Sequence, residues 1–116
     1  MSDGSNAANM SLAPGVLDTI IALAATGVKG VAAVEAPAPG GLREILFSKE
    51  APRAIEVTMG DGGRAQVELH LKARYGFALP DVAAEVRSAV ADALQVQAGV
   101  ETDRVDVYVD SLAFAA

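Results

Sequence analysis

The chain contains one histidine, His70, so any acid–base or metal-binding chemistry that uses an imidazole depends on this residue. Its neighbours in an alternating segment are Glu68 and Lys72, and no further ligands follow at the spacing of metal sites. Cysteine is absent, which removes disulfides, thiolate ligands and cysteine nucleophiles together. Catalysis needs groups that converge, and the sequence shows none converging on His70. We therefore expect a histidine that faces solvent or an interface; a small enzyme or ligand carrier built on it is an alternative.

Two glycine-rich motifs are similar to loops that bind phosphate or RNA. The first, residues 60–63 (GDGG), lies between two strand-like segments with no Lys-Ser or Lys-Thr after it, so we expect a hairpin turn. The second, residues 27–30 (GVKG), has the GxxG form of the clamp in KH domains. That clamp joins two helices, whereas GVKG separates a helix from a strand-like segment. We expect a helix end followed by a turn, and a KH-like RNA-binding module is the other alternative function.

Acidic residues near the C-terminus are candidates for a divalent-cation site. Asp106 and Asp110 are four residues apart in a strand-like segment, which places them about 13 Å apart along it, too far to share one ion. We expect a solvated acidic edge and predict no catalytic, cofactor-binding or metal-binding residues. The acidic set consists of Glu101, Asp103, Asp106 and Asp110.

The composition favours one domain with an aliphatic core. At 116 residues the chain has the length of a single domain, and with 52% hydrophobic but only 4% aromatic residues its core must use Ala, Val, Leu and Ile. The net charge of -6 opposes binding to nucleic acid and to anionic lipid. The longest apolar run, residues 20–25, is far shorter than the roughly 20 residues that span a bilayer. With no basic segment of a secretory signal at the N-terminus, we expect a cytoplasmic protein without direct membrane insertion.

Hydrophobic spacing predicts the order helix, strand, hairpin, helix, strand. Residues 1–13 are small and polar, and we expect a flexible tail followed by one domain over residues 14–113. Apolar residues recur at helical spacing from Gly15 to Thr26, and Gly27 ends that helix. We interpret the following segments as a strand over 28–35, a loop over 36–41 and one helical turn over 42–49.

A β-hairpin is the clearest local pattern, because strict alternation flanks the Gly/Asp turn at residues 60–63. The inner face is predicted to carry Ile55, Val57, Met59, Val67, Leu69, Leu71, Ala73 and Tyr75. The outer face is expected to meet water or a protein partner. It carries Glu56, Thr58, Gln66, Glu68, His70, Lys72 and Arg74.

The second helix is predicted over residues 80–97, where Pro80 and Asp81 favour a helix start and Gly99 ends the pattern. Residues 104–112 alternate again and close the fold as a strand. The fold class is therefore a small α/β (α+β) domain with a three- to four-stranded mixed sheet, two helices on one face and a right-handed crossover. The inward residues of these two elements are Val82, Val86, Ala89, Val90, Ala93, Leu94, Val105, Val107 and Val109.

The chain resembles the alkaline shock protein family of bacterial envelope stress response proteins. The shared pattern in its second half is an alternating strand that ends in Tyr-Gly, followed by a proline, Val-Ala, a Val-rich helix and a closing Val-x-Val-x-Val strand. The resemblance spans residues 15–112 and includes the upstream GVKGV, the pair Leu46-Phe47 and the segment Ile55-Glu56-Val57. The residues that carry its later part are Tyr75, Gly76, Pro80, Val82, Ala83, Glu85, Val86, Val90, Val105, Val107 and Val109.

This resemblance implies a non-enzymatic cytoplasmic protein of cell-envelope homeostasis, without assigned catalytic residues or cofactors. Some members are recruited to the inner face of the membrane by a small membrane-anchored relative. We therefore expect a homo-oligomer, a complex with a small membrane-anchored protein, or both. Charges of both signs and open sheet edges suit such contacts. The candidate interaction surface consists of Glu68, His70, Lys72, Arg74, Phe77 and Tyr108.

Overall fold

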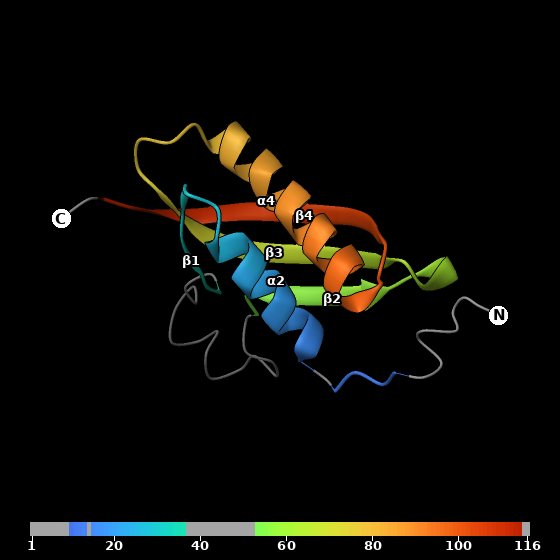
Figure 1. The fold of residues 1–116 in the computed structure, drawn as a ribbon. Helices are drawn as coiled ribbons and strands as arrows, with labels where there is room; N and C mark the ends of the chain where they lie inside the picture. Colours follow the sequence, from blue (N-terminus) through green and yellow to red (C-terminus); the bar gives the residue numbers. More distant parts are fainter. Residues whose placement is uncertain (1–9, 14, 37–52, 115–116) are drawn as a thin grey trace.

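The structure is a computed structural model, and it describes residues 10–13, 15–36 and 53–114. Both helices lie on the same face of a four-stranded sheet (Figure 1), so the predicted fold class is confirmed. The predicted helical turn over 42–49 and most of the loop over 36–41 lie outside the described residues. In chain order the elements are α2 (Val16–Thr26), β1 (Val31–Val34), β2 (Ile55–Met59), β3 (Ala65–Arg74), α4 (Leu79–Ala93) and β4 (Thr102–Ala113).

Strand β3 is the centre of the sheet. On one edge it pairs in parallel with β4, so that Val67 lies opposite Val105 and His70 opposite Tyr108. On the other edge it pairs antiparallel with both β2 and β1. The sheet is therefore mixed, as predicted, and the parallel pair is the one that the predicted crossover requires.

Strands β1 and β2 lie end to end on that second edge, like one strand split in two. The split falls at His70, whose backbone carbonyl accepts a hydrogen bond from the N–H of Glu35 at 3.2 Å. The N–H of His70 donates to the carbonyl of Ala54 at 2.8 Å. Glu35, just after β1, and Ala54, just before β2, thus bond to the same residue of β3.

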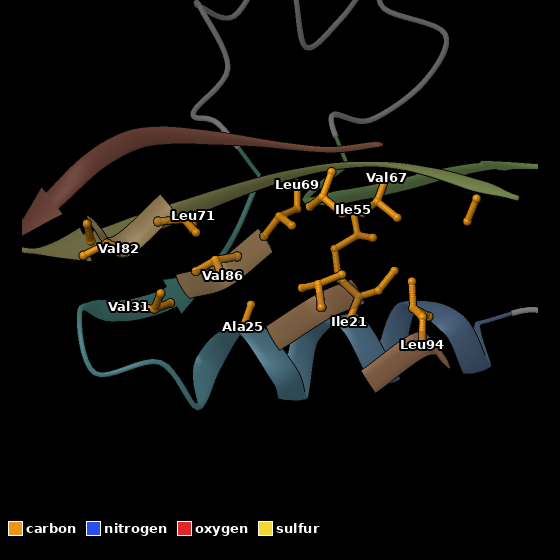
Figure 2. Close-up of a cluster of buried hydrophobic side chains, with 14 residues drawn as sticks. Ile21, Ala25, Val31, Ile55, Val67, Leu69, Leu71, Val82, Val86 and Leu94 are labelled. Carbon is orange, nitrogen blue, oxygen red and sulfur yellow. The ribbon is translucent and has the colours of Figure 1, made fainter. Parts of the chain in front are cut away.

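The core lies between the sheet and the two helices (Figure 2). Alternate residues of β3 point into it, because the helices cover one face only and successive strand side chains point to opposite faces. Leu69 and Leu71 are fully buried there. Burying a side chain of this size stabilises the fold by about 1.5–3 kcal/mol. The helices contribute Ile21 and Ala25 from α2 and Val82, Val86, Val90 and Leu94 from α4 and the turn that continues it.

Helix α4 begins and ends close to the predicted residues. Pro80 lies in its first turn with Asp81, where a missing backbone N–H costs nothing and a negative charge is favourable. The helix continues into a π-helical turn, η2 (Leu94–Ala98), and Gly99 ends it with a φ of 68°. Before the helix, Gly76 has a φ of 101°, which turns the chain out of the sheet.

Three details differ from the sequence-based predictions. Tyr75 and Met59 were expected on the buried face, yet both are exposed. Tyr75 follows the last residue of β3 and precedes the turn at Gly76, whereas Met59 is the last residue of β2, beside the hairpin turn. The first strand is shorter than residues 28–35, because the N–H of Val31 donates to the carbonyl of Val28 and forms a turn there.

Candidate interaction surface

The outer face of the sheet, opposite the helices, carries most of the predicted interaction residues. On β3 the residues that alternate with the buried ones are Glu68, His70 and Lys72, and on β4 Tyr108 lies opposite His70. No described element covers this face, because both helices pack on the other one. Arg74 is the last residue of β3, so the structure places five of the six candidate residues on two adjacent strands.

His70 lies at the centre of a side-chain cluster. Its Nδ1 lies 2.7 Å from a carboxylate oxygen of Asp110, and its Nε2 lies 3.3 Å from one of Glu68. Its ring stacks on that of Tyr108, with centroids 4.8 Å apart and an interplanar angle of 16°. The histidine side chain is only 17% exposed. We name Glu68, His70, Tyr108 and Asp110 the His70 cluster.

The expectation that no groups converge on His70 was therefore wrong. The reason is the position of Asp110, which is 40 residues away in the chain and lies at a register shift in the β3–β4 ladder. Val109 pairs with Leu71 and Ser111 with Lys72, so Asp110 is an extra residue without a partner of its own. This bulge gives Asp110 a position from which its carboxylate contacts the imidazole.

The His70 cluster contains an imidazole and two carboxylates, the groups of an acid–base pair, but the hollow beside it is small for a ligand. A neutral imidazole carries one N–H and donates to one carboxylate, whereas an imidazolium donates to both. The adjacent hollow, which shares Glu68, has a volume of about 60 Å³. Ligand pockets are usually about 300–1,000 Å³. Among the described residues no three His, Asp or Glu side chains are placed to hold a metal ion.

Two further charged candidates, Lys72 and Arg74, follow His70 along the central strand β3. Lys72 approaches Glu35, with Nζ 3.9 Å from a carboxylate oxygen. Arg74 is the last residue of β3, and its exposed side chain lies beyond the His70 cluster. On β4, Asp106 is paired with Arg104 at 3.0 Å. This face therefore carries charges of both signs.

Aromatic side chains are exposed rather than buried. The chain has three Phe, two Tyr and no Trp, and Phe47 lies outside the described residues. The other four have exposed fractions of 43% for Phe77, 45% for Tyr108, 66% for Tyr75 and 70% for Phe114. In most proteins such side chains supply much of the buried area. Here the core uses aliphatic residues, as the composition predicted, and the aromatic residues are at the surface.

Three of these aromatic residues lie around the end of β3, and we name Tyr75, Phe77 and Phe114 the end-of-sheet aromatics. Tyr75 and Phe114 pack with ring centroids 5.0 Å apart, and the N–H of Tyr75 donates to the carbonyl of Ala113. Phe77 lies with one side against the fold, because a Cβ on Gly30 would be 3.3 Å from its ring. Its other side is open to solvent.

The glycine motifs occupy the positions expected of structural turns. Residues 61–63 form a 3-10 turn between β2 and β3, with a φ of 73° at Gly62 and at Gly63. In GVKG, Gly27 ends α2. Gly30 is buried against Val82 and Phe77, just before β1. The motif therefore joins a helix to a strand, unlike a KH clamp, which joins two helices.

Neither α2 nor α4 has the length and the apolar character of a bilayer-spanning helix, and no other described segment does.

These features define a class: a small two-layer α+β domain with both helices on one face of a mixed sheet and a polar, aromatic-bearing surface on the other. Residues 3–114, nearly the whole chain, match the alkaline shock protein 23 family, which is described as having a cell envelope-related function. The chain belongs to this family, in agreement with the resemblance drawn from its sequence. No curated protein and no solved structure matches the chain.

Proposed function

We propose that this protein is a non-enzymatic interaction module that serves its cell envelope-related role from the cytoplasm, by binding a small membrane-anchored protein. The contact surface consists of the outer face, with the His70 cluster, and the end-of-sheet aromatics. In this proposal the protein reaches the membrane through its partner and does not insert into it.

The observation that carries the proposal is the exposure of all four described aromatic residues. Protein interfaces are enriched in Tyr, Phe and Arg, and aromatic anchors supply a large share of binding energy. A chain with so few aromatic residues that leaves Tyr75 and Phe114 at the surface exposes its largest apolar side chains to water. Covering them with a partner protein would stabilise the complex.

The charges on the outer face support a protein partner rather than a nucleic acid or a lipid surface. Glu68, Lys72 and Asp110 lie within one small area and have both signs, which sets the register of a complementary protein surface. A phosphate backbone would be repelled by the net charge of -6.

Site-specific photocrosslinking tests the proposal in the native host. A photoreactive phenylalanine derivative placed at Tyr108 or Tyr75 is expected to crosslink to a membrane-anchored protein, recovered from the membrane fraction. The matched control is Leu23, which is 69% exposed on α2, in the helical layer. A derivative at Leu23 is expected to give no such product.

Two results would contradict the proposal. One is the same crosslinked products from Leu23 as from Tyr108. The other is the absence of a membrane protein from every crosslink formed at Tyr108 or Tyr75. Salt-sensitive RNA binding in a filter assay, lost when Lys29 is changed, would instead favour the KH-like alternative.

A further inference from the structure

We propose that β4 pairs antiparallel with β4 of a second copy of this chain, with the two-fold axis at Val107. The inference goes beyond the proposed function, because the partner at the edge of β4 is a second copy of this chain and not the membrane-anchored protein. The two copies would form one continuous sheet with their helices on the same side.

The edge of β4 is the longest strand edge in the described fold. β4 covers Thr102–Ala113, 12 residues, and among the described residues it pairs with β3 alone. Between the two register shifts, residues 104–109 pair with 66–71 without interruption. A long regular edge strand presents backbone donors and acceptors in the spacing that another strand requires.

The burial pattern of β4 limits the possible registers. Opposed residues of an antiparallel pair point to the same face of the sheet. Val105, Val107 and Val109 face the helical layer, whereas Asp106 and Tyr108 face outward. If the two-fold axis passed between two residues, inward valines would lie opposite outward charged residues. The axis must therefore pass through a residue.

Charge then selects among the remaining registers, because two copies that each carry a net charge of -6 repel one another unless opposite charges meet. An axis at residue 106 places Asp106 opposite itself. An axis at residue 108 places Asp106 opposite Asp110 on both sides of the centre. Like charges directly opposite one another destabilise a strand pair.

An axis at Val107 removes both conflicts. Val105 then lies opposite Val109 on the helical side, and Arg104 lies opposite Asp110 of the second copy, twice by symmetry. Asp110 is the bulge residue just beyond the regular segment 104–109, and its Oδ2 contacts His70, so the proposed pair uses its Oδ1. Arg104 is exposed and held only by its own Asp106 among the described residues, so it is accessible to a second carboxylate. An axis at residue 105 also meets the charge requirement through Arg104 and Asp106, but it puts Asp103 opposite Val107.

Pairing at Val107 would place two outer faces side by side in one sheet. Each face carries its own His70 cluster, so a dimer would present two copies of the surface to an anchored partner. Two linked sites bind a surface-bound partner more tightly than one, because the second contact forms within the same complex. Weak individual contacts would then suffice for recruitment.

Charge reversal distinguishes the registers. The native chain is expected to have about twice the monomer mass of 11.8 kDa in light scattering coupled to size exclusion. Arg104→Asp faces Asp110, and Asp110→Arg faces Arg104, so each variant alone is expected to dimerise about tenfold or more weakly. Mixed in equal amounts they are expected to form a heterodimer, and the double variant is expected to dimerise again.

Folding of each variant is checked by circular dichroism, because Asp110→Arg also removes a contact of His70. The mixture provides a second control, since two misfolded chains would not restore each other. Dimerisation of Asp110→Arg with native affinity would overturn the register at Val107, as would failure of the mixture to associate. A native chain that stays monomeric at high concentration would overturn the pairing itself.

Light scattering and crosslinking together separate this inference from the proposed function. Crosslinking of Tyr108 to a membrane-anchored protein by a monomeric native chain would support the proposed function and overturn the β4 pairing. A β4 dimer with the expected charge dependence and no membrane partner would support the pairing and contradict the recruitment role.

Discussion

Replacement of Gly30 by alanine tests the packing of the turn between α2 and β1. An added Cβ would overlap a methyl group of Val82 and lie 3.3 Å from the ring of Phe77. Val82 is buried in the core on the first turns of α4, so it has little room to move. The backbone of Gly30 is not in the left-handed region, so the expected effect is purely steric.

The magnitude follows from two opposing terms. Overpacking of a well-filled core costs about 1–3 kcal/mol. Alanine also restricts the unfolded chain relative to glycine, which offsets about 0.4–1 kcal/mol of that cost. We expect Gly30→Ala to lower the free energy of unfolding by about 1–2 kcal/mol. With an m value of roughly 2 kcal/mol/M, the urea midpoint falls by about 0.5–1 M.

Gly27, in the same GVKG motif, provides the matched control. It has a φ of -76° and a ψ of -11°, which alanine adopts without strain. A Cβ there would meet only the carbonyl oxygens of Ala24 and Leu23, at 3.5 and 3.6 Å. Gly27→Ala should therefore raise the free energy of unfolding by about 0.4–1 kcal/mol in the same urea titration. Equal losses for both variants, or an unchanged midpoint for Gly30→Ala, would refute the reasoning.

Three further changes test the core, a helix end and the His70 cluster. Leu69→Ala should lower the free energy of unfolding by about 2–5 kcal/mol in urea titration, because Leu69 is fully buried; Leu23→Ala, at an exposed position, should stay within about 0.5 kcal/mol. Gly99→Ala should cost about 1–2 kcal/mol in thermal unfolding, since its φ of 68° is left-handed. Asp110→Ala should cost about 0.5–1.5 kcal/mol and shift the ring NMR signals of His70, because it removes the acceptor 2.7 Å from Nδ1; unchanged ring signals would contradict that contact.

The sequence predicts the fold correctly where a residue pattern is compatible with only one arrangement of the chain. Alternation in β3 is unambiguous, because a one-residue slip would expose Leu69 and bury Glu68. The two helices each end at a glycine, and Pro80 fits only near a helix start. The pattern does not show where a strand ends, so Tyr75 was placed on the buried face although the chain turns at Gly76.

The composition of the candidate surface was partly predictable, but its contacts were not. Glu68 and His70 are two residues apart in a strand, which places them on the same face. In the structure Nε2 of His70 lies 3.3 Å from Oε2 of Glu68. The contact between His70 and Asp110 depends on the register of a parallel pair and on a bulge within it. Neither leaves a local mark in the sequence. Whether these residues bind a partner stays a prediction.

The split between β1 and β2 brings both ends of the segment between them to one residue of β3. The ends of the intervening segment, Glu35 and Ala54, both bond to the backbone of His70, so their separation is set by β3. Closing a loop between fixed ends costs only about 0.6 kcal/mol more for each doubling of its length. The distance between the two ends is therefore set by a single residue of the central strand, whatever the length of the segment that joins them.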